Sequence, residues 1–556
     1  MARILNLVII ILEVVSMSNT FKSRGFVKNF VFYTQLSNMM TFFASLLLVI
    51  FGQKDWVEVL RFLSVSMLVM TFFVTACILA PWSRMVKELL FSGSGLYHHT
   101  IIPILSTLTY MLFEKRAPFH WIWLPGVLTL IYGLVMLYFN YIDVVDGPYP
   151  FFKIKQQGIK VTVLWMFALF MAVTVFSVLL GYHKPPKTDI KYIYVHGLSG
   201  WGSYDAQYEY FPYWGMFGGD VVRYMNEQGY ESYAASVDPS GSAWDRACEL
   251  YAQLSGTRVD YGKAHSESAG HERFGRDYSS APLVKDLSDS RYVLIGHSFG
   301  GATIRLFSEI IRNGAAEEIE STDPADLSPF FKGGAGEKLL AVVTLAAPTN
   351  GTTAYDLHED SSFDLSKIEI PEKYEKSNDR MKRSTGAKAN DGRADWDYAS
   401  YDMHIDNALA MNERITTFED VYYFAYPCDS TTIDENGELV PDPAITEDMF
   451  MKSSIYACKY TGTTKGGFCV DESWKPNDGL VNTVSAKAPI GEPSVEYTKE
   501  QLASGAGAAG VDFAPGIWNV MPTRRGDHMS LQGGMFKRVK VKGFYLELAQ
   551  MLAALE

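Results

Sequence analysis

The sequence predicts an α-helical transmembrane bundle followed by an α/β domain with a mostly parallel central sheet. Three observations lead to this fold class: six apolar stretches before residue 184, alternating strand and helix patterns after residue 190, and a change of charge between the two parts. Residues 1–183 carry 13 Lys and Arg against 7 Asp and Glu, whereas the rest of the chain carries 36 against 55. Net charges of +6 and −19 indicate a membrane part joined to an acidic, water-exposed part, which excludes nucleic acid as a partner.

The six apolar stretches approach or reach the roughly 20 residues that a membrane-spanning helix needs. They lie at 3–20, 29–51, 62–81, 98–113, 121–140 and 160–182. No A-x-A-like cleavage site follows the first stretch before the second begins, so we expect a retained helix rather than a signal peptide. The sequence therefore predicts about six spans within a domain of residues 1–183, a linker at 184–190 and a second domain at 191–556.

Basic residues in the loops predict the orientation of these spans. Loops after the first, third and fifth stretches hold eight Lys and Arg. The opposite side holds five, including Arg61, or seven with Lys184 and Lys187. By the positive-inside rule, both termini are expected outside. We therefore expect a multi-pass protein of the cell membrane with an extracellular second domain.

The second domain begins with an alternation of strands and helices. KYIYVHGLSGWG (191–202) is typical of a strand that ends in a Gly-rich loop. A helix near 218–228, a strand near 231–237 and a strand at KLLAVVTLAAP (338–348) follow. This order predicts a parallel sheet with helices on both faces.

The stretch YVLIGHSFGG (292–301) carries the strongest local signal for chemistry. An apolar strand pattern precedes Gly296-His-Ser298-Phe-Gly300, and a helical pattern follows it. This is the nucleophile elbow of the α/β-hydrolase fold, in which a sharp turn exposes the serine and glycines let strand and helix approach. Ser298 is therefore the predicted nucleophile.

A serine nucleophile needs a histidine base and a carboxylate, which follow it in this order along an α/β-hydrolase chain: Ser, Asp or Glu, then His. Of the later histidines, His358 and His404 lie in a polar region at about 352–420, where we expect a lid insertion. His528 lies before a predicted C-terminal helix and is the expected base. Asp478 is the expected acid, although its Asn-Asp-Gly context is also typical of a plain turn.

The tetrahedral intermediate also needs an oxyanion hole made of N–H donors. One donor should follow the nucleophile, which gives the backbone N–H of Phe299. The other should come from the loop after the first strand, which gives the backbone N–H of Leu198.

The segment 242–278 predicts a metal site. It places Asp245, His265 and His271 in a region otherwise poor in histidine. Two imidazoles and a carboxylate are ordinary zinc ligands, and a closed structural site needs a fourth. The alternative is that these residues are solvated surface groups.

Seven short motifs follow one another along residues 191–556: HGLSGWG, WDRACELYAQL, VDYGKAH, GHSFGG, APTNGTT, NDGLVNTVS and DHM. In these motifs the chain resembles the secreted zinc-containing lipases of Gram-positive bacteria, of the staphylococcal and Geobacillus type. The resemblance implies lipid ester hydrolysis by Ser298, Asp478 and His528. It also implies structural Zn²⁺ on Asp245, His265 and His271. The family's fourth ligand motif is missing, which leaves Asp379, Asp391, Asp395 and Asp397 as candidates.

The same family binds calcium beside its catalytic histidine. There a Glu follows two residues after the histidine and an Asp-Pro soon beyond. Here Met529 and Ser530 follow His528, no Asp-Pro appears, and the segment gains positive charge. We therefore expect Ca²⁺ to be absent.

Two stretches of the membrane part carry polar residues that are costly in hydrocarbon. FVFYTQLSNMM (30–40) and YHHTIIP (97–103) resemble the androgen-induced family of membrane threonine hydrolases and related six-span bacterial proteins. The resemblance implies a second site with Thr34 as nucleophile and His99 as its partner. The alternative is that both residues only form hydrogen bonds between helices.

The leading hypothesis is a membrane-anchored serine carboxylester hydrolase, with lipid esters as substrates and membrane lipids as partners. The alternatives are a bifunctional protein with a second site at Thr34 and His99, or a membrane part that only anchors the chain or binds lipid. A disulfide between Cys458 and Cys469 remains open, because nothing in the spacing fixes it.

Overall fold

The computed structural model describes residues 2–24, 29, 31–114, 116–117, 119–145, 149–181, 187–285, 287, 290–375, 392–503 and 511–556. The chain divides into two compact units, Met1–His183 and Lys184–Glu556.

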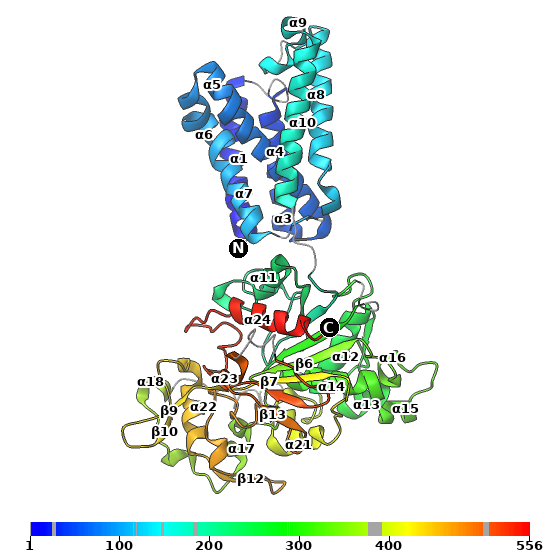
Figure 1. Cartoon of the computed structure of the whole chain (residues 1–556), viewed down its shortest axis with the longest axis vertical. Helices are drawn as coiled ribbons and strands as arrows, with labels where there is room; N and C mark the ends of the chain where they lie inside the picture. The colour runs from blue at the N-terminus through cyan, green and yellow to red at the C-terminus, as the bar shows by residue number, and fades with distance from the viewer. Residues whose placement is uncertain are drawn as a thin grey trace. The chain divides into compact units, whose positions relative to one another are not determined.

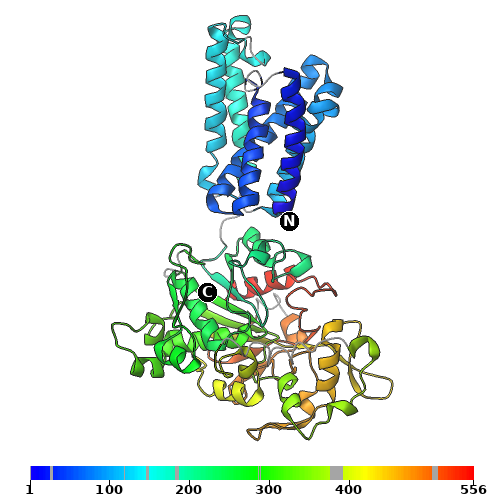
Figure 2. The ribbon, with the colours of Figure 1, turned by 180° about the vertical axis from the view of Figure 1, so that it is seen from behind.

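Long apolar helices form the N-terminal unit (Figure 1). They are α1 (Ala2–Arg24), α3 (Tyr33–Phe51), α4 (Asp55–Val74), α7 (Ile102–Phe113), α8 (Leu124–Tyr141) and α10 (Ile159–Gly181). Seen from behind, α1 in dark blue runs alongside α3 (Figure 2). Exposed apolar side chains lie on α1, α3, α7, α8 and α10, as expected for helices surrounded by lipid, whereas α4 is largely buried among the other helices.

Five helices of the described residues are long and apolar enough to cross a membrane. They are Ala2–Thr20, Tyr33–Phe51, Trp56–Ser83, Leu124–Tyr141 and Ile159–Gly181. The stretch expected to span at 98–113 instead begins as a π-helical turn, Tyr97–Ile101, and continues as the 12-residue α7. The prediction of a sixth span is therefore not confirmed.

A buried ion pair lies inside the N-terminal unit. Arg61 on α4 donates from Nε to Glu114 Oε2 at 2.9 Å and from Nη2 to Glu114 Oε1 at 3.0 Å. Asn6 on α1 donates to the same carboxylate at 2.8 Å. Arg61 is fully buried, so counting it as a loop charge in the orientation prediction was wrong.

A seven-stranded sheet forms the centre of the C-terminal unit, in the order β13-β14-β7-β6-β5-β1-β2. Every neighbouring pair of its strands is parallel. The strands are β1 (Lys191–Val195), β2 (Ser232–Ala235), β5 (Tyr292–His297), β6 (Leu339–Leu345), β7 (Tyr422–Tyr426), β13 (Ser494–Glu496) and β14 (Trp518–Val520). The expected parallel α/β sheet is therefore present.

Side chains that alternate along the strands divide the core between the two faces of the sheet. Tyr192 and Tyr194 of β1 pack with α11 (Val221–Gln228) and α24 (Lys542–Ala553). Ile193 and Val195 pack on the other face. That face is covered by α12 (Ala243–Ser255) and α14 (Gly300–Asn313). Burial on both faces explains why these strands are apolar almost throughout.

Short helices lie between β6 and β7, where we expected a lid insertion. They include α17 (Thr353–Glu359), α18 (Glu372–Glu375), α20 (Ala399–Asp402) and α21 (Ile405–Asn412). Residues 376–391 of the expected insertion lie outside the described residues.

All five cysteines lie in the described part of the chain and carry free thiols. Cys458 is buried on α22 (Asp448–Lys459) and lies 3.4 Å from the side-chain nitrogen of Asn477. Cys469 is exposed on the short strand β12 (Cys469–Val470). The Cys458–Cys469 disulfide left open above is not formed.

Candidate functional site

Ser298 stands in a strained turn between β5 and α14. Its φ is +54°, in the left-handed region that side chains rarely adopt. A Cβ on Gly296 would lie 2.4 Å from the Gly300 carbonyl oxygen, and one on Gly300 would lie 2.3 Å from a carbonyl oxygen of β1. Only glycine fits these two positions, so the local sequence dictates the turn that exposes the Ser298 hydroxyl.

Three residues distant in sequence meet at this turn. His528 Nε2 lies 2.8 Å from Ser298 Oγ, and His528 Nδ1 lies 2.9 Å from Asp478 Oδ2. Two backbone N–H groups, at residues 480 and 481, hold the other Asp478 oxygen at 3.0 and 2.8 Å. All three side chains are at most 7% exposed. The arrangement can pass a proton from hydroxyl to imidazole and stabilise the resulting charge.

The two expected oxyanion donors belong to the two segments next to Ser298. Phe299 follows the nucleophile at the start of α14, and Leu198 lies in the loop after β1. Within the described chain, neither backbone N–H donates to another protein group. The loop runs close to the nucleophile, because a Cβ on Gly197 would lie 2.7 Å from Ser298 Cβ.

A buried hydrogen-bond chain connects that loop to the base, which sequence reasoning missed. The Gly197 N–H donates to the Tyr213 hydroxyl at 3.0 Å, and this hydroxyl donates to His297 Nδ1 at 2.7 Å. His297 Nε2 then donates to the His528 carbonyl oxygen at 2.8 Å. Burial lowers the pKa of His297 to about 3, so the ring stays neutral with its proton on Nε2. The signal was available in the elbow itself, whose histidine, His297, directly precedes Ser298.

The other two late histidines lie elsewhere. His404 Nδ1 lies 3.5 Å from Asp356 Oδ1, and His404 Nε2 lies 3.7 Å from Glu359 Oε1. His358 is exposed on α17. Among the described residues, neither contacts Ser298.

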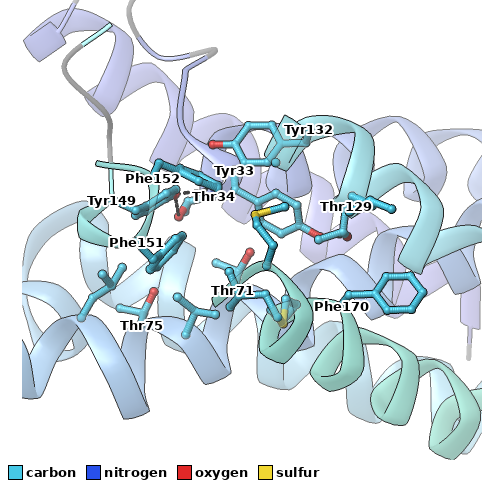
Figure 3. A pocket seen from close by; sticks show the side chains of 17 residues that line it. Tyr33, Thr34, Thr71, Thr75, Thr129, Tyr132, Tyr149, Phe151, Phe152 and Phe170 are labelled. Carbon is cyan, nitrogen blue, oxygen red and sulfur yellow. Dashed lines mark hydrogen bonds between the residues drawn. The ribbon is translucent and has the colours of Figure 1, made fainter. Parts of the chain in front are cut away.

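A partly open pocket, lined mainly by apolar and aromatic side chains and threonines, lies in the N-terminal unit (Figure 3). Thr34 lies on its wall, and the Thr34 hydroxyl is 3.5 Å from the Tyr149 hydroxyl. His99 does not line it, and His99 Nδ1 lies 2.8 Å from the Leu89 carbonyl oxygen. The structure therefore does not bring the expected Thr34–His99 pair into contact.

The neighbouring histidine of the same turn is the buried one. His98 Nε2 lies 3.0 Å from the Thr20 hydroxyl, and His98 Nδ1 lies 4.0 Å from a Glu13 carboxylate oxygen. Sequence reasoning selected His99 and missed His98. The adjacent His-His pair was the signal that either ring could be the buried one.

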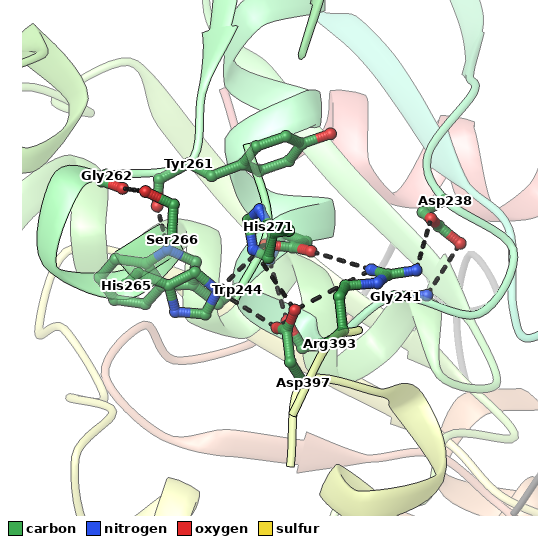
Figure 4. Close-up of polar contacts among 12 residues, drawn as sticks. Asp238, Gly241, Trp244, Tyr261, Gly262, His265, Ser266, His271, Arg393 and Asp397 are labelled. Atoms are coloured by element: carbon green, nitrogen blue, oxygen red, sulfur yellow. Dashed lines mark hydrogen bonds and ion pairs between the residues drawn. The ribbon is translucent and has the colours of Figure 1, made fainter. Parts of the chain in front are cut away.

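Four possible metal ligands converge in the C-terminal unit (Figure 4). One ligand atom from each of Asp245, His265, His271 and Asp397 lies within 4.8 Å of all the others. His265 Nε2 is 3.1 Å from Asp245 and 3.2 Å from Asp397. His271 Nε2 and Asp397 Oδ2 are buried without a hydrogen-bond partner. Two nitrogen and two oxygen donors, some unsatisfied, fit a closed four-ligand metal site.

Local structure positions each of these ligands. Asp245 lies in the first turn of α12, and the helix-capping Ser242 hydroxyl donates to Asp397 at 2.8 Å. His265 lies on α13 (Lys263–Ala269), whose first N–H groups donate to Glu318. Of the four candidates for the fourth ligand, Asp397 is the one that lies beside Asp245, His265 and His271. Asp395 is exposed, whereas Asp379 and Asp391 lie outside the described residues.

A positive charge lies beside the His528 loop. The Lys537 ammonium donates to the Pro443 and Thr446 carbonyl oxygens. The Lys537 backbone N–H donates to Glu447 at 2.6 Å, and the Glu447 N–H donates to Asp527 at 2.9 Å. These contacts join the segment after His528 to the loop at 443–447.

Known proteins match the C-terminal unit. Residues 188–370 match the family model described as "Lipase-like, C-terminal domain". "Lipase 2" of Staphylococcus aureus is 32% identical over 380 residues, covering 63% of this chain and 51% of that protein. "Lipase" of Staphylococcus hyicus is 30% identical over 402 residues, covering 67% and 58%. The chain thus spans about half the length of the curated relatives it matches.

Solved structures give the same result for the fold. The crystal structure of Staphylococcus hyicus lipase matches with a TM-score of 0.54 and 27% identity, over 67% of this chain and 97% of that chain. EstA from Clostridium botulinum matches with a TM-score of 0.54 and 27% identity, over 68% and 90%. These matches confirm the predicted lipase α/β-hydrolase fold, while the resemblance expected for the N-terminal unit stays a prediction. The C-terminal region is therefore a lipase-like domain, similar in sequence and fold to the staphylococcal lipases.

Proposed function

We propose that the chain is a serine carboxylester hydrolase that cleaves lipid esters. The observation that carries the proposal is the continuous contact from Asp478 through His528 to Ser298, at 2.9 and 2.8 Å, on a turn with φ of +54°. The relatives named lipase support the same reaction class.

The geometry supports a two-step acyl transfer. His528 Nε2 takes the proton from Ser298 as the serine oxygen attacks the ester carbonyl carbon. The imidazolium then gives this proton to the leaving alcohol, and an acyl-serine remains. Water, deprotonated by the same histidine, cleaves the acyl-serine, releases a carboxylic acid and restores the hydroxyl. Asp478 keeps the imidazole in the tautomer that accepts at Nε2 and stabilises the imidazolium.

The oxyanion of both tetrahedral intermediates would accept hydrogen bonds from the backbone N–H groups of Phe299 and Leu198. Each such donor contributes about 3–4 kcal/mol to transition-state stabilisation. Because neither donates within the described protein, no internal bond has to break before the substrate oxygen arrives.

We further propose that Asp245, His265, His271 and Asp397 hold Zn²⁺ in a structural role. The ion would supply a cross-link between α12, α13 and the segment before α20, on donors that zinc prefers. With all four positions taken by protein, no site for reacting water is left. Purified protein should contain about one zinc per chain, and Asp397→Asn should lower this content. Asp395→Asn, an exposed neighbour, is the matched control. Full zinc content in Asp397→Asn would contradict the fourth-ligand assignment.

The apolar helices of the N-terminal unit support a membrane anchor, and we propose that the hydrolase domain lies outside the cell. A tether of this kind would raise the effective concentration of the domain at a surface that holds lipid esters. A second hydrolytic site at Thr34 has less support, because His99 bonds to a backbone carbonyl oxygen rather than to this threonine.

Serine-reactive phosphonate labelling of intact cells tests nucleophile and location together. We expect labelling and ester hydrolysis in wild type, and neither in Ser298→Ala. Ser308→Ala, a buried serine on α14, the helix that follows the nucleophile turn, should retain both. If Ser298→Ala keeps its activity and Thr34→Ala loses it, the assignment is wrong.

A further inference from the structure

A basic pocket lies beside the His528 loop and takes no part in the proposed hydrolysis. It is open to solvent, and its lining includes Gly526 and Ser530, which flank Asp527 and His528. Four of its lining residues are cationic: Arg524, Arg525, Lys537 and Arg538.

Charge sets this pocket apart from the rest of its unit. Residues 524–542 hold six Lys and Arg and one Asp, a net charge of +5, whereas residues 184–556 have a net charge of −19. Cations gathered in a concavity of an acidic domain create a local field that attracts anions.

Two of the four cations already have hydrogen-bond partners in the protein. The Arg525 guanidinium donates to Asp442 at 2.8 Å, and the Lys537 ammonium donates to backbone carbonyl oxygens. The other two have no carboxylate partner among the described residues. Arg524 lies over the Phe544 ring at 4.6 Å, and Arg538 lies over the Phe217 ring at 5.4 Å. Stacking holds a guanidinium in place and leaves its N–H donors available.

Aromatic side chains reach solvent next to these guanidiniums. Phe536, between Met535 and Lys537, is 75% exposed, and Phe217 is 51% exposed. Exposed aromatic rings among basic residues are typical of surfaces that enter the boundary between headgroups and acyl chains. A free anion in water would bind to the cationic side chains but would make no contact with the exposed rings.

We propose that this pocket binds the phosphate of an anionic lipid headgroup. Arg524 and Arg538 donate to the phosphate oxygens, as guanidinium groups do in paired geometry. Phe536 and Phe217 enter the lipid surface around it. The proposal rests on the proposed membrane location but not on the catalytic triad, and it gives the hydrolase domain a fixed contact with an anionic membrane surface.

Binding is measured on the full chain in phosphatidylcholine nanodiscs, with Ser298→Ala so that no ligand is hydrolysed. The probe is a soluble short-chain phosphatidylglycerol, titrated calorimetrically, with inorganic phosphate as a second arm. We expect saturable binding of the phosphatidylglycerol that weakens as salt concentration rises, and at least tenfold weaker binding of inorganic phosphate.

The variant pair Arg524→Gln and Arg538→Gln tests the assignment of residues. Each cation near an anionic surface contributes about fivefold to affinity, so the pair should weaken binding about twentyfold or more. Lys338→Gln with Arg414→Gln removes two exposed cations elsewhere in the unit and should change affinity less than twofold. If the double variant does not fold, Arg538→Gln alone should weaken binding about fivefold.

Two outcomes overturn the proposal. Unchanged affinity in the arginine variants would mean that lipid binds elsewhere. Equal affinity for inorganic phosphate and phosphatidylglycerol would mean a site for free anions. Because the chain carries Ser298→Ala in every arm, neither outcome reports on ester hydrolysis, which the phosphonate labelling above tests separately.

Discussion

Tyr213→Phe offers a direct test of the buried chain that links the oxyanion loop to the base. The lost hydroxyl leaves the Gly197 N–H without its acceptor and His297 Nδ1 without its donor. Tyr213 is 4% exposed, so water does not readily replace the hydroxyl. Each of the two unpaired buried groups costs about 1–3 kcal/mol, so the free energy of unfolding should fall by about 2–6 kcal/mol.

Activity should fall as well, because Gly197 precedes the Leu198 donor and His297 supports the His528 backbone. Partial loss of one oxyanion donor, worth about 3–4 kcal/mol when fully removed, gives an expected decrease in kcat of about 10- to 100-fold. KM for a short soluble ester should change little, because the ground-state contacts remain.

The assay compares kcat, KM and the unfolding midpoint of the full chain in detergent. Tyr192→Phe is the matched control, because this buried tyrosine donates to a carbonyl oxygen of α24 at 3.3 Å and takes no part in the chain from Gly197 to His528. It should lower stability by about 1 kcal/mol and leave kcat unchanged. If Tyr213→Phe retains kcat within twofold of wild type, the chain does not position the oxyanion loop.

Three further predictions concern backbone geometry, pH and the N-terminal unit. Gly300→Ala should abolish activity and lower the yield of folded protein, because its Cβ would lie 2.3 Å from a carbonyl oxygen. Gly543→Ala, with open space around it, should preserve both. Burial raises the pKa of Glu249 to about 8 from 4.5, so the folded state binds the extra proton. The stability that depends on this group is therefore full below pH 4.5 and is lost as pH rises through 8. Glu249→Gln should flatten this part of a midpoint-versus-pH curve, and an unchanged slope would refute it. Arg61→Met leaves a buried carboxylate unpaired and should cost about 3–5 kcal/mol of unfolding free energy. Lys155→Met breaks an exposed pair and should cost at most about 1 kcal/mol; equal midpoints for the two variants would contradict this difference.

Features that depend on neighbouring residues were predictable from the sequence. The elbow around Ser298 is set by glycines two positions away on either side, so its strain can be read from five consecutive letters. The strand and helix order of residues 191–348 follows in the same way from local apolar patterns. His528 could be selected because the order of residues in this fold leaves few histidines to choose from.

Features that depend on distant contacts were not predictable in the same way. Asp397 meets His265 and His271 only through folding, and its own surroundings in the sequence do not distinguish it from Asp395. His98 and His99 differ by one helical position, which rotates a side chain by about 100° around the axis. The π-helical turn at 97–101 changes the direction of each side chain around the axis further. The sequence alone therefore could not tell which of the two rings faces inward.

The carboxylate of Glu114 has a consequence for how the chain is made. Its partners, Asn6 and Arg61, are synthesised before it and sit on α1 and α4. A helix that carries an unpaired guanidinium is poorly retained in hydrocarbon. The ribosome must extend the nascent chain by more than fifty residues before Arg61 meets its counter-ion. If the N-terminal unit enters a membrane as proposed above, we expect α1 and α4 to stay beside the insertion machinery until α7 and Glu114 have emerged.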